Sequence, residues 1–287
     1  DPVTFPFYQP VEILNNLKAT IAATAQVPKL AIILIGQNPA SLIYVGNKIK
    51  QAAAIGAQAS VIKFDEDVCE NQLLDKIDQL NKDSKISGII VQLPLPKHIN
   101  LSKVIQSIEP GKDIDGFNPL NVGILQTRQI ANNNSISKSF LPCTALACMS
   151  AIKSASIDLT GKHAVIVNRS NLVGKPLANL LLEQNATITI CHSFSTELDK
   201  ITKLGDIVIC AIGKAKFFNR NYFKPGAIVI DVGISRTDEG RISGDVDFDD
   251  LLGHASYITP VPGGIGPLTV AHLLSNLVSS LNVKLEK

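Results

Sequence analysis

The sequence predicts an α/β fold with two domains. Short apolar runs of strand length alternate with segments of helical periodicity between residues 29 and 91, and the same alternation begins again at His163. Between the two sets lies Ala131–Ser139, a polar segment rich in residues that break regular structure. With 287 residues the chain is long enough for two hydrophobic cores, so we interpret this segment as a linker.

Composition narrows the class of protein. Apolar residues make up 45% of the chain and charged residues 18%, and no apolar run approaches the ~18 residues that cross a bilayer. The net charge of +2 comes without a basic stripe, so we expect neither a nucleic-acid nor a membrane partner. The chain has no secretion signal and starts at Asp1 rather than Met, so we expect it to begin after processing or truncation.

The five cysteines show no spacing typical of a metal site, and we expect no bound metal. Their number is odd, and Cys191 and Cys210 lie inside apolar runs. Both observations indicate reduced, buried thiols in a cytoplasmic protein.

The first α/β set follows the order expected for parallel strands. Its first apolar run is bounded by Pro28 and Gly36 and has the character of a strand buried on both faces. The predicted elements are strands at Lys29–Ile35, Ser60–Phe64 and Gly88–Val91, and helices at Val11–Ala25 and Asn71–Asn81.

A further helix follows the first strand. Asn38 is a suitable N-cap, Pro39 suits the first turn, and Gly56 is a plausible stop. Tyr44 and Lys48 are four residues apart, so their side chains lie on one face of this helix. Taken alone, such a lysine is more often a solvated surface charge.

Ligands of open α/β sheets bind beyond the carboxyl ends of the strands. Gln92 directly follows the third strand, and Lys48 belongs to the helix after the first, so both can face one crevice. Taken alone, Gln92 is more often an ordinary loop amide. The loop Pro110–Asn118 carries Asp113 and Asp115 between turn signals, but it lacks the further oxygen ligands of a calcium-binding loop.

The second α/β set has the pattern of a dinucleotide-binding domain. The glycine-rich fingerprint of such domains is degenerate here, with Asn168, Ser170 and Gly174 at its positions. The predicted elements are strands at Ala164–Val167, Thr187–Cys191, Ile207–Ile212 and Ala227–Val232, and a helix at Lys175–Gln184.

The second strand of this set ends without the acidic residue that holds the ribose of NAD. His192 and Ser193 follow it, and Arg169 lies in the turn after the first strand. A guanidinium, a hydroxyl and an imidazole suit a 2′-phosphate, because arginine forms charge-assisted hydrogen bonds with phosphate. The sequence therefore favours NADP over NAD.

The last motif, Thr259–Thr269, is rich in glycine and proline. The glycines allow the backbone to approach a flat or bulky ligand, whereas a simple turn before a helix would not need so many. Pro267 begins a helix whose apolar residues are predicted to pack on another domain: Val270, Leu273, Leu274, Leu277 and Val278.

Five motifs occur here together and in the order of one family. They are Tyr44-x-x-x-Lys48, Val91–Pro96, Lys112–Gly116, Arg169-Ser170 with Val173-Gly174, and Pro262–Pro267. From about Leu30 to Leu274 the chain resembles the bifunctional methylenetetrahydrofolate dehydrogenase/cyclohydrolase family. The resemblance implies two α/β domains with a cleft between them: a folate-binding catalytic domain of residues 1–138 and 265–287, and a Rossmann-like NADP-binding domain of residues 139–264.

The resemblance also implies two reactions at one folate site. A hydride passes from 5,10-methylenetetrahydrofolate to NADP, and the methenyl cation is then hydrolysed to 10-formyltetrahydrofolate. A homodimer is the usual assembly of the family. We expect no fused formyltetrahydrofolate synthetase, because the chain ends about where this module does.

The family assigns roles to residues of both domains. By resemblance, Lys48 serves the hydrolysis, Gln92 hydrogen-bonds Lys48, Tyr44 stacks on the folate, and Asp115 anchors the pterin through two N–H donors; Asp113 is interpreted as structural. These four are the implied catalytic residues, and they also bind substrate. Further implied substrate contacts are Val91, Leu93, Pro262, Gly263, Gly264, Ile265 and Gly266, and implied cofactor contacts are Asn168, Arg169, Ser170, His192, Ser193 and Ile234.

Three features depart from the family pattern. Asn168 stands where Gly usually precedes Arg-Ser, which puts a side chain near the pyrophosphate. Ala145-Leu146-Ala147 replaces the usual Pro-Lys-Gly, and the usual opening of the family is not recognisable before Pro10. None of these features touches the implied catalytic residues.

Two other functions stay open at this point. The first is a relative that keeps only the dehydrogenase, with NAD as a candidate cofactor; the presence of Lys48 and Gln92 and the missing acid near Ser193 argue against it. The second is a folate- or nucleotide-binding protein that has lost turnover. Retention of Lys48 argues against this function, because a protein that only binds has no need of such an amine.

Overall fold

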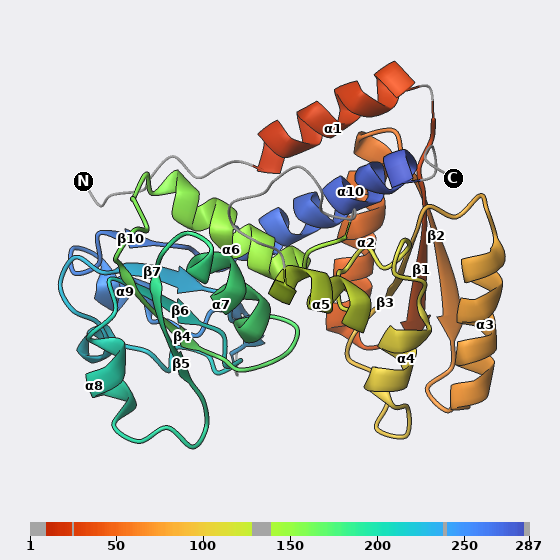
Figure 1. Ribbon diagram of the computed structural model, residues 1–287. Coiled ribbons are helices and arrows are strands. Elements are labelled where there is room, and N and C mark those ends of the chain that lie inside the picture. The colour runs from red at the N-terminus through yellow and green to blue at the C-terminus, as the bar shows by residue number, and fades with distance from the viewer. Residues whose placement is uncertain (1–9, 25, 128–138, 238–239, 284–287) are drawn as a thin grey trace. The chain divides into compact units, whose positions relative to one another are not determined.

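The computed structural model describes residues 10–24, 26–127, 139–237 and 240–283, the side chains of residues 282 and 283 excepted. The chain forms two compact units (Figure 1). The first comprises Pro10–Cys143 and the chain from Val270 onward, and the second comprises Thr144–Thr269. The division falls a few residues C-terminal to the predicted domain boundaries, and the predicted linker, except for Ser139, lies outside the described residues.

The predicted elements of the first unit are present, with ends close to the predicted ones. The helix predicted at Val11–Ala25 is confirmed as far as Thr24, and Ala25 lies outside the described residues. The elements are α1 (Pro10–Thr24), β1 (Lys29–Ile35), α2 (Pro39–Ala54), β2 (Gln58–Phe64), α3 (Glu70–Lys82), β3 (Gly88–Val91), the unpredicted helices α4 (Leu101–Ser107) and α5 (Pro119–Thr127), and α10 (Ile265–Val283), which belongs to this unit from Val270.

Helix α2 begins and ends as its sequence predicts. The Asn38 side-chain oxygen accepts hydrogen bonds from the backbone N–H groups of Ala40 and Ser41 at 3.0 and 3.2 Å, and Pro39 occupies the first turn. Gly56, with φ of +88°, takes the left-handed conformation just beyond the helix. Both ends of the helix that carries two candidate site residues are therefore fixed by local interactions.

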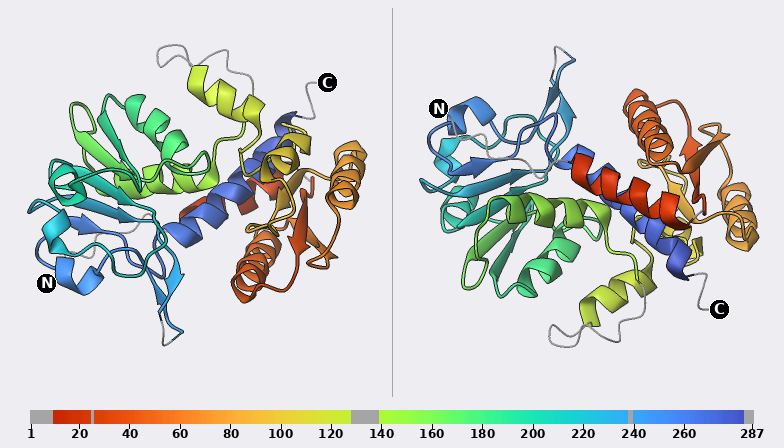
Figure 2. Two further views of the ribbon diagram at one scale, coloured as in Figure 1. Left: turned by 90° about the horizontal axis from the view of Figure 1, so that it is seen from below. Right: turned by 90° about the horizontal axis from the view of Figure 1, so that it is seen from above.

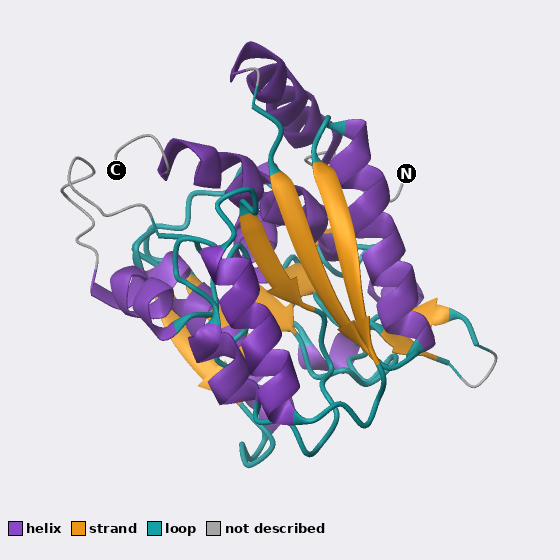
Figure 3. Cartoon of the chain, turned by 90° about the vertical axis from the view of Figure 1, so that its right-hand side faces the viewer, coloured by secondary structure: helices purple, strands orange, loops and turns teal. Residues whose placement is uncertain are grey.

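The three strands of the first unit form a parallel sheet in the order β2-β1-β3 (Figure 3). The central strand β1 is buried at every position but its first, as predicted for a strand with two covered faces. Alternate residues of β1 enter one core with α1, α2 and α10, and the residues between them enter a second core with α3 and α4. This double burial explains why β1 is a continuous apolar run.

Helix α10 closes the first core. The residues predicted to pack on another domain are all buried in this core, with residues of α1, β1 and α2: Val270, Leu273, Leu274, Leu277 and Val278. Leu17 and Ile21 of α1 enter the same core, and the two helices run side by side (Figure 2). The apolar stripe of the C-terminal helix therefore completes the unit formed by the N-terminal half of the chain.

The second unit contains the predicted strands and one predicted helix, together with several short elements that were not predicted. The predicted elements are β4 (His163–Val167), α7 (Gly174–Leu182), β5 (Thr187–Cys191), β6 (Ile207–Cys210) and β7 (Ile228–Asp231). The others are α6 (Cys143–Ser154), α8 (Leu198–Thr202), the 3-10 helix η1 (Arg220–Tyr222), β8 (Ser235–Arg236), β9 (Ile242–Ser243), α9 (Phe248–Leu251) and β10 (Tyr257–Ile258). Across both units, no helix of the described part is long and apolar enough to cross a membrane.

Five parallel strands of the second unit form a sheet in the order β10-β7-β6-β4-β5. This is a doubly wound arrangement, and the strand order reverses between β4 and β6. Ligands of such sheets bind at the reversal, outside the carboxyl ends of the strands. The turns after β4 and β6 are therefore the place to look for a cofactor site.

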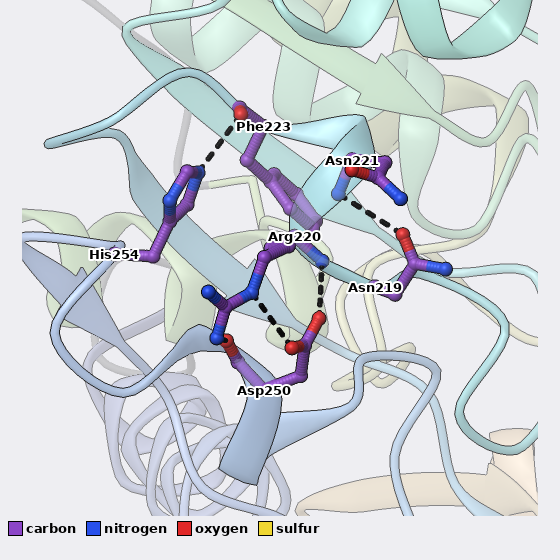
Figure 4. Close-up of polar contacts among 6 residues, drawn as sticks. All are labelled: Asn219, Arg220, Asn221, Phe223, Asp250 and His254. Carbon is purple, nitrogen blue, oxygen red and sulfur yellow. Dashed lines mark hydrogen bonds and ion pairs between the residues drawn. The ribbon is translucent and has the colours of Figure 1, made fainter.

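An arginine–carboxylate contact fastens η1 to α9 (Figure 4). The backbone N–H and the Nε–H of Arg220 each donate to the carboxylate of Asp250 at 2.7 Å, and an Nη donates to the Asp250 carbonyl oxygen at 2.7 Å. His254 Nε2 lies 3.0 Å from the carbonyl oxygen of Phe223. These contacts join the segment before β7 to the segment before β10, which is a structural role.

A buried lysine anchors the loop between α4 and α5. The ammonium of Lys112 donates to the carbonyl oxygens of Leu80, Asn81 and Asp83 at 2.8, 2.6 and 2.8 Å. These carbonyls lie at the end of α3, where a helix leaves its last carbonyl groups without intrahelical partners. Lys112 therefore caps α3 and fixes the start of the loop that carries Asp115.

Replacing Lys112 by Met should lower the free energy of unfolding by about 3 kcal/mol, because buried carbonyl groups lose a charged donor. Urea unfolding at neutral pH measures this. Lys82→Met is the matched control at the same helix end: its partner Asp78 is exposed and lies 2.5 Å away, and loss of this pair should cost less than about 0.5 kcal/mol. Equal effects of the two substitutions would contradict the capping role.

Candidate active site

Lys48 and Gln92 meet at the end of the first sheet. The Lys48 ammonium donates to Gln92 Oε1 at 3.0 Å, which is the hydrogen bond that the resemblance implies. Gln92 Nε2 donates to the carbonyl oxygen of Leu93 at 2.9 Å, and because a carbonyl can only accept, the amide must turn its oxygen toward the lysine. The Gln92 backbone N–H donates to Ile33 of β1 at 2.9 Å. The sheet therefore fixes the residue that holds the amine.

Two further side chains share this face of α2. Tyr44 lies one helical turn before Lys48 and is half-buried, and burial raises the pKa of its hydroxyl. Ser41 is buried, and its hydroxyl donates to the Leu93 carbonyl oxygen at 3.4 Å. Sequence reasoning did not single out Ser41, although its position three residues before Tyr44 places it on the same face. Val91, also predicted at the site, is the buried last residue of β3.

Asp113 is a structural carboxylate, in agreement with the interpretation from sequence. It is buried and accepts hydrogen bonds from the backbone N–H of Asn118 at 2.6 Å and from Asn121 Nδ2 at 3.0 Å. Burial raises its pKa to about 6, against the lowering effect of these bonds. A parallel bridge to Ile89 places this part of the loop beside β3.

Asp115 is in a different environment from Asp113, two residues earlier. It is half-buried, and none of the described residues donates a hydrogen bond to its carboxylate. Burial raises the pKa of Asp115, and the nearby positive charge of Lys48 opposes this effect. A partly buried carboxylate that receives no hydrogen bond from the protein can accept hydrogen bonds from a ligand. This carboxylate is also close enough to the candidate catalytic amine of Lys48 to interact with its charge.

Helix α10 holds the loop that carries Asp115 through the side chain of Asn276. Asn276 Nδ2 donates to the carbonyl oxygens of Ile114 and Leu141 at 2.9 and 3.0 Å. Gly116 has φ of +76°, and a Cβ there would lie 2.5 Å from the Leu141 backbone, so only glycine fits. The sequence carried no local signal for Asn276, because its partners are far away along the chain.

In the second unit, Asn168 ties together the turns after β4 and β6. Its Nδ2 donates to the carbonyl oxygen of Ala211 at 2.6 Å, and its Oδ1 accepts from the backbone N–H groups of Ser170 and Gly174 at 2.8 and 3.1 Å. A Cβ on Gly174 would lie 2.1 Å from the Asn168 carbonyl oxygen. Asn168, which replaces the glycine usual in the family, therefore has its side-chain amide hydrogen-bonded within the protein. It lies where the strand order of the sheet reverses.

The parallel pairing of β4 with β5 brings Arg169 and the turn after β5 to the same edge of the sheet. Arg169 and Ser193 are exposed, and His192 is half-buried. Among the described residues no carboxylate pairs with Arg169; its guanidinium carbon lies 5.5 Å from the ring centroid of Phe194. A guanidinium without a carboxylate partner can bind an anionic group such as a phosphate. Phe194 was missed by sequence reasoning.

Two buried carboxylates hold the remaining turns of this edge. Asp245 accepts from three consecutive backbone N–H groups after β6 at 2.5 to 3.1 Å: Ile212, Gly213 and Lys214. Asp231, at the end of β7, accepts from Gly233, Asp245 and Val246 at 2.9 to 3.0 Å, and burial raises its pKa to about 6. Sequence reasoning missed both residues. The sequence feature that could have indicated them is the nearby glycines. A Cβ on Gly233 would lie 2.1 Å from the Asp245 carboxyl carbon, so a glycine is required beside this carboxylate.

The predicted segment Pro262–Gly266 lies in the second unit. Gly263 has φ of +107°, and a Cβ on Gly264 would lie 2.5 Å from a carbonyl oxygen of the preceding turn, so the turn itself requires these two glycines. A Cβ on Gly266 would lie 3.9 Å from the exposed side chain of Ile234, a predicted cofactor contact. That this segment contacts folate stays a prediction.

The second departure from the family pattern has a simple structural setting. Ala145 and Ala147 are fully buried in α6, where small apolar residues allow close packing of the helix.

The five cysteines are all free, and only Cys69 is exposed.

Two family models match the chain. A model described as tetrahydrofolate dehydrogenase/cyclohydrolase, catalytic domain, matches residues 10–115. A model described as tetrahydrofolate dehydrogenase/cyclohydrolase, NAD(P)-binding domain, matches residues 142–285.

Similar proteins extend over nearly the whole chain. A bifunctional protein FolD of Rickettsia massiliae is 51% identical over 94% of this chain and 92% of the relative. The structure of the bifunctional enzyme FolD, methylenetetrahydrofolate dehydrogenase/cyclohydrolase, of Campylobacter jejuni has a TM-score of 0.89 and 42% identity, covering 96% of each chain. The Trypanosoma brucei methylenetetrahydrofolate dehydrogenase-cyclohydrolase, solved with NADP and an inhibitor, has a TM-score of 0.90 and 33% identity, covering 97% of this chain and 96% of that one.

Asp113→Asn should flatten the pH dependence of unfolding between about pH 4 and pH 6. The folded-state pKa of about 6 lies above the ordinary carboxyl value of about 3.9, so in this window the folded chain binds more protons than the unfolded chain. The free energy of unfolding therefore falls as pH rises. Asparagine keeps an acceptor oxygen but does not titrate, so the share of Asp113 in this fall, at most about 3 kcal/mol, disappears.

Urea unfolding of the wild type and Asp113→Asn at several pH values measures the difference. An Asp113→Asn variant with the wild-type slope would contradict a raised pKa at this carboxylate.

Proposed function

The chain belongs to the tetrahydrofolate dehydrogenase/cyclohydrolase family, and we propose that Lys48, Gln92 and Asp115 carry out its folate chemistry. It is a bifunctional enzyme that oxidises 5,10-methylenetetrahydrofolate to the methenyl form with NADP and hydrolyses that product to 10-formyltetrahydrofolate. The observation that carries the site assignment is the 3.0 Å hydrogen bond from Lys48 to Gln92 beside the free carboxylate of Asp115.

The residues at the edge of the second sheet fit NADP. Arg169 has no carboxylate partner among the described residues, and Ser193 is exposed in the turn after the neighbouring strand β5, so these two would hold the 2′-phosphate. Ser170 and the turn after β4, tied down by Asn168, would face the pyrophosphate, with His192 and Ile234 as flanking contacts. When bound, NADP supplies the hydride acceptor for the oxidation.

Asp115 and Tyr44 would bind the folate. A carboxylate can accept hydrogen bonds from the amino group and the adjacent ring N–H of a pterin together. None of the described residues donates to either carboxylate oxygen of Asp115, so both oxygens can accept from the pterin. The half-buried ring of Tyr44 would stack on a flat ligand, beside Val91 and Leu93. The segment Pro262–Gly266 would add backbone contacts.

The hydrolysis needs a group that moves protons. Water adds its oxygen to the methenyl carbon and loses a proton, and one carbon–nitrogen bond then breaks as its nitrogen takes up a proton. Lys48 would accept the first proton and donate to the leaving nitrogen. Gln92 would orient the amine through its amide oxygen, which Leu93 holds in place.

Two broader features belong to the same proposal. We propose a homodimer and a cytoplasmic location for the enzyme. Its family supports both, and its five free cysteines support the location. Size-exclusion chromatography with light scattering measures the assembly directly.

Lys48→Met should abolish hydrolysis and leave folate bound. An absorbance assay with methylenetetrahydrofolate, run with NADP and separately with NAD, follows both steps. The wild type should form the methenyl species with NADP and then accelerate its decay. In Lys48→Met the accelerated decay should fall by about 10²-fold or more, because the proton carrier is gone.

Lys50→Met is the control for this experiment, because Lys50 is an exposed lysine on the same helix. Wild-type hydrolysis in Lys48→Met would remove Lys48 from the mechanism. Absence of any NADP-dependent signal in the wild type would contradict the proposed function itself.

A further inference from the structure

Phe194 is an exposed aromatic residue in a rigid turn. Its side chain is 78% exposed, so burial does not explain its presence. The turn is locked by three hydrogen bonds: Ser195 N–H to the His192 carbonyl oxygen at 2.9 Å, His192 N–H to Ser195 Oγ at 2.9 Å, and Phe194 N–H to His192 Nδ1 at 3.2 Å. These bonds fix the backbone that carries the ring.

The ring faces Arg169 from the neighbouring strand end. The guanidinium carbon lies 5.5 Å from the ring centroid, within the range of a cation–π contact, and the His192 ring meets Phe194 edge-on at 6.2 Å. A carboxylate partner would compete with an anionic ligand for the guanidinium donors. An aromatic ring does not, so Arg169 keeps its charge and its N–H groups for the ligand.

We propose that Phe194 is a positioning residue that holds the Arg169 guanidinium in place for the 2′-phosphate and thereby strengthens the preference for NADP over NAD. The proposal rests on the proposed function, which assigns the phosphate to Arg169. An exposed arginine loses rotamer freedom when it binds a ligand, and a ring that restricts the side chain beforehand reduces this loss. The contribution concerns only the cofactor that carries a 2′-phosphate.

The experiment compares Phe194→Leu, Phe194→Tyr, Arg169→Ala and the double variant Phe194→Leu/Arg169→Ala. KM and kcat for methylenetetrahydrofolate oxidation are measured with NADP and with NAD. Calorimetry of 2′,5′-ADP and 5′-ADP binding gives a readout that does not depend on folate.

In Phe194→Leu the KM for NADP and the Kd for 2′,5′-ADP should rise about two- to five-fold, the range that an exposed cation–π contact is worth. The values for NAD and 5′-ADP, and kcat with NADP, should not change. Phe194→Tyr keeps the ring and should restore the wild-type values. In the Arg169→Ala background Phe194→Leu should have no further effect, because the two residues act as one unit.

Equal losses for the phosphorylated and unphosphorylated ligands would overturn the proposal and indicate direct stacking of the ring on the adenosine. Additive effects in the double variant would overturn it as well. If Arg169→Ala removes the preference for NADP while Phe194→Leu does not change it, the phosphate site stands and only this inference fails. If Arg169→Ala leaves the preference intact, the assignment of the phosphate to Arg169 fails with it.

Discussion

The buried ammonium of Lys112 determines where the free carboxylate of Asp115 lies. Three carbonyl groups at the end of α3 hold this ammonium, and Asn118 and Asn121 hold the carboxylate of Asp113. Because both charges are satisfied inside the protein, they fix the loop without reaching its ligand face. Asp115 lies near the charge of Lys48 and has no hydrogen-bond donor among the described residues. In the proposed function, the bound folate would supply these donors.

In the second unit, too, buried polar groups that are hydrogen-bonded within the protein fix the turns. Asp245 and Asp231 are buried carboxylates whose oxygens accept from backbone N–H groups of the turns at the carboxyl edge of the sheet. Asn168 ties the turns after β4 and β6 together with a neutral amide. The exposed guanidinium of Arg169 is left for an anionic ligand. In both units, buried groups that are hydrogen-bonded within the protein fix the turns. The two charged side chains proposed to bind ligands, Asp115 and Arg169, have no ion-pair partner among the described residues.

Sequence reasoning succeeded where the signal was local. The continuous apolar run of β1, the N-cap Asn38 and the spacing of Tyr44 and Lys48 all follow from neighbouring residues, and the structure contains each. Short helices such as α4 and α5 span too few residues for a clear period. Asn276 and Phe194 act through partners that only the fold brings near, and nothing in the spacing of the two carboxylates in the loop shows which one is buried.

The assignment of Asp115 can be tested by calorimetry of tetrahydrofolate and NADP binding to Asp115→Asn, together with urea unfolding of this variant. Tetrahydrofolate affinity should fall about tenfold or more, because charge-assisted hydrogen bonds are lost. NADP affinity should not change, and the free energy of unfolding at neutral pH should stay the same or rise, because a partly buried charge without a described donor is removed. Unchanged tetrahydrofolate affinity, or a clear loss of stability, would contradict the assignment of Asp115 as the free, ligand-binding carboxylate of this loop.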